Sequence, residues 1–123
     1  MIFKVLIVDD DYINRRLLIS LLKKELYKIE VLEAINGQDA LKKCHDHQGI
    51  QLILLDVEMP RMDGANFLKH YKEEKTLPNV PIIAVSSNDL RIKEVLSLGA
   101  NAFLVKPVTE EKLLTAIQKS LTV

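Results

Sequence analysis

Residues 51–64 read QLILLDVEMPRMDG, and the four aliphatic residues 52–55 in this stretch run directly into a carboxylate, Asp56. A short, continuous apolar segment bounded by polar residues is typical of a strand that is buried on both faces. A carboxylate at the end of such a strand is costly to bury unless another group pairs with its charge or uses it. The stretch therefore predicts one strand of a covered sheet, ending in a residue with a chemical role.

The same kind of apolar segment recurs along the chain and alternates with helical patterns. We expect further strands at residues 3–8, 29–34 and 102–105 and within the stretch PNVPIIAVSS. Helices are expected at 12–26, 38–47, 64–75 and 90–98 and after Thr109, with Asp11 and Thr109 as caps. The apolar positions of the first helix are Ile13, Leu17, Leu21 and Leu22. A strand followed by a helix, five times in succession, predicts an α/β fold with a parallel sheet covered on both faces.

Composition and charge narrow the class of protein. The chain has 123 residues, 48% of them hydrophobic, and no linker or internal repeat is visible, so we expect one domain over residues 1–123. Its 17 basic and 17 acidic residues balance, which argues against direct binding of nucleic acid. No apolar run approaches the roughly 20 residues of a membrane span, and the N-terminus lacks a signal-peptide pattern. The single cysteine, Cys44, fits a reducing compartment, so the expected location is cytoplasmic.

Polar residues follow four of the predicted strands. Asp9 and Asp10 follow the first, Asp56 the third, Ser86 the fourth and Lys106 the fifth. The carboxyl ends of parallel strands lie along one edge of a sheet, so we expect these side chains to converge. Three close carboxylates repel one another and need a cation, and oxygen ligands of this kind suit Mg²⁺.

The chemistry expected of this edge is phosphoryl transfer. A carboxylate can act as a nucleophile and form an acyl phosphate, which gives Asp56 a role. Mg²⁺ on Asp9 and Asp10, with Lys106 and Ser86 on the phosphoryl oxygens, completes such a site. The alternative is a salt-bridged edge in which Lys106 only neutralises the aspartates.

Four motifs together closely resemble the receiver domain of bacterial two-component response regulators: VLIVDDD at 5–11, LILLDVEMPRMDG at 52–64, IIAVSS at 82–87 and FLVKP at 103–107. The resemblance spans essentially the whole chain. It implies a doubly wound, flavodoxin-like sheet of order 2-1-3-4-5 flanked by five helices. It also implies a regulatory domain, not an enzyme acting on other substrates, that catalyses only its own phosphorylation and dephosphorylation. Its implied partner is a sensor histidine kinase or a phosphotransfer protein.

The resemblance assigns roles to residues of the predicted edge. Asp56 is the implied phosphoacceptor and receives the phosphoryl group from a phosphohistidine. Asp9 and Asp10 match the acidic pair that holds Mg²⁺, together with Asp56 and the backbone carbonyl of Glu58. Lys106 matches the lysine that contacts the acyl phosphate.

The resemblance also implies a switch. Ser86 matches the hydroxyl that moves toward the acyl phosphate, and Phe103 matches the aromatic residue that then rotates inward. Phe103 replaces the more frequent tyrosine, so its rotation would gain packing without a hydrogen bond. The Lys106-Pro107 bond resembles one that is cis in this family. Residues 86–106 form a shorter stretch than is usual, a difference that bears on the geometry of the fourth helix.

Two other functions remain as alternatives. Asp9 and Asp11 have the spacing of the first motif of haloacid-dehalogenase-type phosphatases, but that reading gives Asp56 no role. A pseudo-receiver that binds partners without phosphorylation would not need the full set of strand-end residues. The basic residues of the first helix are expected on a solvated face. The alternative is that they contribute to docking of the kinase: Arg15, Arg16, Lys23 and Lys24.

Three other residues invite a functional reading that we do not adopt. His45 and His47 lie two positions apart on a predicted helix and so point in different directions, which favours a solvated surface over a metal site. Cys44 follows Ala40 and Leu41 at core spacing and is expected to be an ordinary buried residue.

Overall fold

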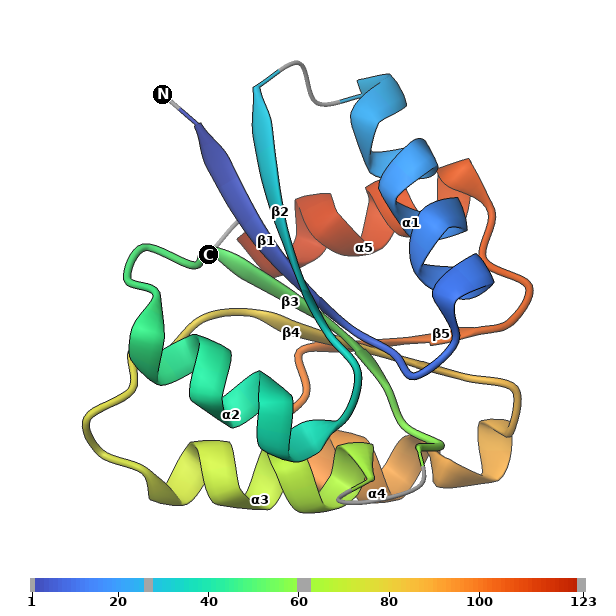
Figure 1. Cartoon of the computed structure of the whole chain (residues 1–123). Coiled ribbons are helices and arrows are strands. Elements are labelled where there is room, and N and C mark those ends of the chain that lie inside the picture. Colours follow the sequence, from blue (N-terminus) through green and yellow to red (C-terminus); the bar gives the residue numbers. More distant parts are fainter. Residues whose placement is uncertain (1, 26–27, 60–62, 122–123) are drawn as a thin grey trace.

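The computed structural model describes residues 2–25, 28–59 and 63–121, and these form one parallel five-stranded sheet of order β2-β1-β3-β4-β5 (Figure 1). This is the order that the resemblance implies. The strands are β1 (Phe3–Val8), β2 (Ile29–Ala34), β3 (Leu52–Asp56), β4 (Ile82–Ser86) and β5 (Ala102–Val105). The helices are α1 (Tyr12–Glu25), α2 (Gly37–Asp46), α3 (Gly64–Glu73), α4 (Ile92–Ser97) and α5 (Glu110–Leu121), and a short 3-10 helix, η1 (Asp89–Arg91), precedes α4.

Helices cover both faces of the sheet: α1 and α5 lie on one, and α2, α3 and α4 lie on the other (Figure 1). Alternate residues of each central strand enter opposite cores. In β3, Leu52 and Leu54 pack toward α1 and α5, whereas Ile53 and Leu55 pack toward α2 and α3. Because both faces of β3 are buried, its sequence is continuously apolar and does not alternate.

The buried face of α1 differs from the predicted one. Leu22 is buried as expected, but Ile13 is 69% and Leu17 53% exposed. The core contacts come from Leu18, Ile19 and Leu22, and Leu21, which was predicted, packs against the same core and is partly buried. The run LLISLL is apolar on more than one side of the helix, so helical spacing alone did not select the face that packs on the sheet.

Side-chain oxygens cap several helices as the residue types predict. Asp11 accepts a hydrogen bond from the Ile13 amide (2.9 Å), and Thr109 accepts one from the Lys112 amide (3.2 Å). The predicted helix at 90–98 is instead split into η1 and α4, whose six residues end just before Leu98 and Gly99. Gly99 has φ +110°, the left-handed backbone expected after a helix.

Several predicted boundaries shift by a residue or two, and Leu26 lies outside the described residues. The longest described helix, α1, has 14 residues. Within residues 2–25, 28–59 and 63–121, no helix has the length and apolar character needed to span a membrane.

Candidate functional site

The predicted acidic cluster forms at the carboxyl ends of β1 and β3. One carboxylate oxygen from each of Asp9, Asp10 and Asp56 lies within 4.8 Å of the other two. Asp9 and Asp56 are buried, at 2% and 4% exposure, whereas Asp10 is exposed. The Lys106 ammonium reaches in from the end of β5, with its Nζ 3.5 Å from Asp56 Oδ1. The structure thus brings together four of the residues that the sequence predicts.

The electrostatics of this cluster are unbalanced. Burial, the nearby Asp9 charge and the Glu58 charge raise the pKa of Asp56 to about 7, although Lys106 opposes the shift. Burial also raises the pKa of Asp9, against a hydrogen bond from the Asp11 amide and the charge of Lys106. One ammonium does not compensate two buried carboxylates and an exposed one. The group therefore has the charge and the oxygen ligands that suit a hard divalent cation.

Arg15 fixes the loop that carries Asp9. Its Nη1 donates a hydrogen bond to the Asp9 carbonyl oxygen (2.8 Å), and its Nε donates to Glu33 on β2 (2.9 Å). Arg16 forms a second ion pair with Glu33. The prediction of a solvated position for Arg15 is wrong, because its side chain is only 11% exposed. Arg15 shares the i, i+3, i+7 spacing of Leu18 and Leu22, the actual buried face, and this signal could have found it.

Asp11 does not belong to the acidic cluster. Its amide donates to Asp9 Oδ1 (2.8 Å), and its exposed carboxylate caps α1. The phosphatase alternative required Asp9 and Asp11 to act as a pair. In the structure it is Asp56 that joins Asp9, so the phosphatase reading has no support.

Gly64 allows α3 to begin directly beneath the end of β3. Its amide donates to the Val57 carbonyl (2.9 Å). A Cβ at this position would lie 2.6 Å from Val57 Cα and 2.8 Å from the Asp56 carbonyl oxygen, both backbone atoms. Only a glycine permits this close approach without displacing the chain at Asp56.

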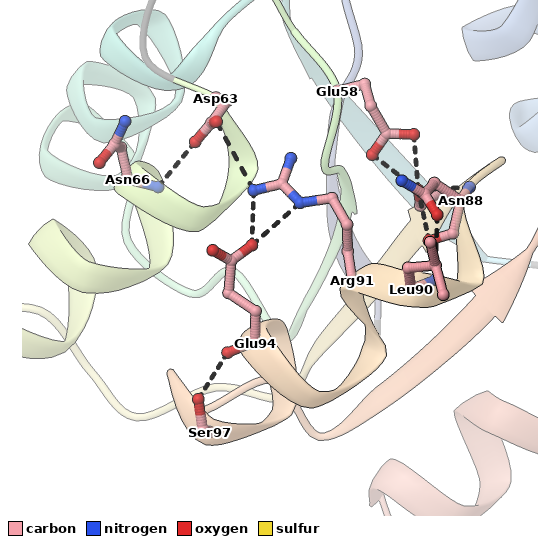
Figure 2. A network of polar contacts seen from close by, with 9 residues as sticks. Glu58, Asp63, Asn66, Asn88, Leu90, Arg91, Glu94 and Ser97 are labelled. Atoms are coloured by element: carbon pink, nitrogen blue, oxygen red, sulfur yellow. Dashed lines mark hydrogen bonds and ion pairs between the residues drawn. The ribbon is translucent and has the colours of Figure 1, made fainter.

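Ser86, at the end of β4, is bonded to Glu58. The Ser86 hydroxyl lies 2.5 and 2.6 Å from the two Glu58 carboxylate oxygens and accepts a hydrogen bond from the Asn88 amide (2.9 Å). The Ser87 amide also donates to Glu58 Oε1 (3.2 Å). Figure 2 shows the Glu58 carboxylate pointing toward the segment that carries Asn88. The sequence predicts a role only for the Glu58 backbone carbonyl and misses this side-chain contact.

A second polar contact joins the same two loops. Arg91 in η1 donates to Glu94 Oε1 through Nε (2.9 Å) and Nη2 (2.6 Å), and Nη2 lies 3.7 Å from Asp63 Oδ2 (Figure 2). Asp63 also caps α3 through the Asn66 amide (3.0 Å). The start of α3 is therefore tied to η1 and α4. This contact lies alongside the contact between Glu58 and Ser86.

Phe103 and Lys106 both lie on or just after β5. Phe103 is half-buried and lines a surface groove of about 340 Å³ with residues of α5. The Lys106 amide donates to the Ser86 carbonyl (2.9 Å), and the Lys106-Pro107 bond is cis, as the resemblance implies. The predicted site residues thus lie on or next to the carboxyl edge of the sheet, except that Phe103 is the second residue of β5 and lies two positions before the end of that strand.

The remaining candidate residues behave as ordinary structural residues. Cys44 is buried, and burial raises the pKa of its thiol to about 11. His45 is exposed, with Nε2 4.0 Å from Glu74. Among the residues that the structure describes, the acidic cluster is the one group of three histidine, cysteine or carboxylate side chains close enough to share a metal ion.

Known proteins are similar to this chain in sequence. The family model described as the response regulator receiver domain matches residues 5–118. The two-component response regulator-like protein PRR37 of Oryza sativa subsp. indica is 39% identical over 113 residues, covering 89% of this chain and 15% of PRR37. The chemotaxis protein CheY of Bacillus subtilis (strain 168) is 31% identical over 121 residues, covering 98% of this chain and 99% of CheY. The chain thus spans a small part of PRR37 but nearly all of CheY.

The fold is shared as well. The crystal structure of the CheX-CheY-BeF3-Mg²⁺ complex from Borrelia burgdorferi contains a chain similar to this one, with a TM-score of 0.88 and 31% sequence identity. The similarity covers 98% of this chain and 90% of that chain. Strand order, motif order and both kinds of similarity agree with the predicted resemblance. The chain belongs to the response regulator receiver domain family.

Proposed function

We propose that residues 1–123 form a single receiver domain that acts as a phosphorylation-driven signalling switch. Asp56 accepts a phosphoryl group from a phosphohistidine on a sensor histidine kinase or a phosphotransfer protein. The observation that carries this proposal is the cluster of Asp9, Asp10 and Asp56, within 4.8 Å of one another, beside the Lys106 ammonium. Such a site positions a nucleophile and neutralises charge, which is most of what phosphoryl transfer demands of a protein.

In the transfer step, a carboxylate oxygen of Asp56 attacks the phosphorus of the phosphohistidine. A P–O bond forms as the P–N bond breaks, and the bonding electron pair returns to the imidazole nitrogen. Asp56 must be ionised to attack. The charge of Lys106 lowers the pKa of Asp56 and so favours the nucleophilic form. The same ammonium then offsets the charge of the phosphoryl oxygens.

The acidic cluster fits Mg²⁺. The carboxylates of Asp9, Asp10 and Asp56 and the backbone carbonyl of Glu58 are the residues that would hold it, since the ion prefers oxygen ligands and keeps several waters. When bound, Mg²⁺ neutralises negative charge on the carboxylates and on the phosphoryl oxygens. The exposed Asp10 gives the ion access from solvent. The presence of Mg²⁺ in the CheX-CheY complex of B. burgdorferi supports this assignment.

The switch consists of Ser86 and Phe103. The Ser86 hydroxyl moves to bond the phosphoryl oxygens, and Phe103 rotates into the space that this movement opens. Phe103 is half-buried at the edge of a groove, which is consistent with two packed positions. The domain changes its partner-binding face in this way and catalyses no reaction beyond its own phosphorylation and dephosphorylation.

An apolar strip on α1 is the surface we assign to the phosphodonor protein. Tyr12, Ile13 and Leu17 are each more than half exposed and follow directly after Asp10 and Asp11. Beside them, a groove of about 360 Å³ runs between α1 and the segment after β5, with Lys106 on its wall. Exposed apolar residues next to a charged site are typical of a docking surface. We place this function in the cytoplasm, without direct binding of nucleic acid.

The test is phosphorylation with a small phosphodonor such as acetyl phosphate in the presence of Mg²⁺. Intact-mass measurement should find one added phosphoryl group per chain, and chelation of Mg²⁺ should abolish it. Asp56→Asn should remove the adduct, whereas Asp46→Asn, which changes an exposed carboxylate on α2, should retain it. Absence of the adduct in the unmodified chain, or its persistence in Asp56→Asn, would contradict the proposal.

A further inference from the structure

The Glu58 carboxylate occupies a set of hydrogen-bond donors at the end of β4. The donors are the Ser86 hydroxyl (2.5 and 2.6 Å), the Ser87 amide (3.2 Å) and the Ser87 hydroxyl (3.4 Å). These donors converge on one anionic group, and charge-assisted bonds of this kind are among the stronger ones in proteins. The same donors would suit any oxyanion, including a phosphoryl group.

Ser86 has no further proton to donate while this contact lasts. A serine hydroxyl carries one donor proton, and its nearest acceptors here are the Glu58 carboxylate oxygens, with the Asn88 carbonyl oxygen further away at 3.3 Å. The hydroxyl oxygen already accepts the Asn88 amide proton (2.9 Å), and Ser86 is fully buried. A bond from Ser86 to a phosphoryl oxygen therefore requires that the bond to Glu58 break first.

Glu58 is also close enough to Asp56 for their charges to interact. The negative charge of Glu58 contributes to the raised pKa of Asp56, so the two carboxylates interact electrostatically. Phosphorylation adds about 1.5 to 2 negative charges and three strong acceptor oxygens. The phosphoryl group therefore repels Glu58 and competes for its donors at the same time. Glu58 is exposed, so its release into solvent exposes little additional surface.

We propose that the side chain of Glu58 is a positioning residue that holds Ser86 and the segment after β4 in the unphosphorylated arrangement. The inference rests on the proposed function and adds to it an internal competitor for the phosphoryl oxygens. Phosphorylation exchanges one anion for another on the same donors. The strength of the Glu58 contact then sets how far the equilibrium favours the inactive arrangement, because a ligand shifts a two-state equilibrium only by its differential affinity.

The experiment uses beryllofluoride, an analogue of a phosphoryl group, titrated into the full chain at saturating Mg²⁺. Glu58→Ala should bind beryllofluoride roughly tenfold more tightly than the unmodified chain, because one charge-assisted hydrogen bond no longer competes. Glu58→Gln keeps the shape and loses the charge, so its affinity should lie between the two. Asp89→Asn removes a carboxylate from the exposed start of η1 and should leave the affinity unchanged.

A second measurement needs neither metal nor phosphoryl analogue. The backbone amide resonance of Ser87 should move in Glu58→Ala, since its acceptor is lost, and stay in place in Asp89→Asn. Equal or weaker beryllofluoride binding in Glu58→Ala would overturn the inference while leaving the proposed function standing. If the unmodified chain and the variants all fail to bind beryllofluoride and to accept a phosphoryl group, the proposed function falls, and this inference falls with it.

Discussion

The guanidinium of Arg15 donates a hydrogen bond to the backbone carbonyl of Asp9, 2.8 Å away, from the buried face of α1. The same side chain reaches Glu33 on β2, so one residue joins the loop that carries Asp9, the first helix and the edge strand. The position of the Asp9 carboxylate thus depends on a residue that has no place in the proposed chemistry.

Replacing Arg15 should weaken both the fold and the acidic cluster. Arg15→Met removes two charge-assisted hydrogen bonds and should lower the free energy of unfolding by about 2 kcal/mol. Arg15→Lys should restore little of the lost stability, because a single ammonium does not reproduce the hydrogen bonds that the guanidinium donates to both Asp9 and Glu33. Urea unfolding measures the stability. A Mg²⁺ titration monitored by the Asp10 amide resonance measures the affinity of the acidic cluster for the ion. Lys23→Met, on the exposed side of α1, is the control and should change neither.

The stability of the metal-free domain should depend on Asp56 ionisation. Burial raises the pKa of Asp56 to about 7 in the folded chain, from 3.8 when unperturbed. Between these values the folded state binds a proton that the unfolded state has lost, so the free energy of unfolding falls as pH rises and levels off above pH 7. Asp56→Asn should therefore be more stable than the unmodified chain at pH 8, by roughly 4 kcal/mol, with little difference at pH 4.

Chemical denaturation at several pH values without divalent ions checks this expectation. The difference between the two chains removes the contribution of groups that do not interact with Asp56, such as Glu33, whose pKa is lowered chiefly by its hydrogen bond to Arg16. Saturating Mg²⁺ should reduce the difference at pH 8, because the ion compensates the carboxylate charge. A stability gap that stays constant from pH 4 to pH 8 would mean that burial does not perturb Asp56.

Gly64→Ala should distort the end of β3. The added methyl group would lie 2.6 Å from Val57 Cα, so the backbone next to Asp56 must move, at a cost of about 2 kcal/mol or more. Phosphorylation by acetyl phosphate should slow in this variant. Gly49→Ala is the matched control: its φ is +84° but nothing lies within 4 Å of the new Cβ. It should cost about 1 kcal/mol through the backbone alone and leave phosphorylation unchanged.

Phe103→Ala should separate phosphorylation from its transmission. Phe103 lies on β5, which β4 separates from the strand that carries Asp56, so the phosphoryl adduct should form normally. Chemical-shift changes on adding Mg²⁺ and beryllofluoride should remain near Asp56 but no longer extend to Thr115 and Lys119, which line the same groove as Phe103. Phe3→Ala changes an aromatic residue at the opposite end of the sheet and should preserve the full spread of changes. Identical spread in both variants would remove Phe103 from the switch.

The fold could be predicted because each strand carries a local signal. A run such as LILL at 52–55 is apolar at every position because both faces of β3 are covered, and polar residues follow the strands where they reach the edge of the sheet. The positions of Asp9, Asp56, Ser86 and Lys106 follow from chain order alone once the sheet is parallel.

Contacts that depend on packing were less predictable. The predicted buried face of α1 was wrong because LLISLL is apolar on two sides of the helix. The prediction of a solvated position for Arg15 was wrong for the same reason. The contact between Glu58 and Ser86 joins residues 28 positions apart, and neither residue type carries a pattern that signals it. Similarly, the division of the predicted helix at 90–98 into η1 and α4 accompanies the cap by Asn88 on Leu90 (3.0 Å), a local hydrogen bond that competes with helix formation.

The double-sided burial of β3 has a mechanical consequence for signalling. Residues 52–55 are at most 1% exposed and are held between two packed layers, so the strand that ends in Asp56 has little freedom to shift when its charge changes. Residues 87–90, by contrast, are exposed and anchored chiefly by polar contacts. If Asp56 is phosphorylated as we propose, we therefore expect the displacement in the exposed segment after β4 and not in β3, and that segment becomes the surface that a partner protein recognises.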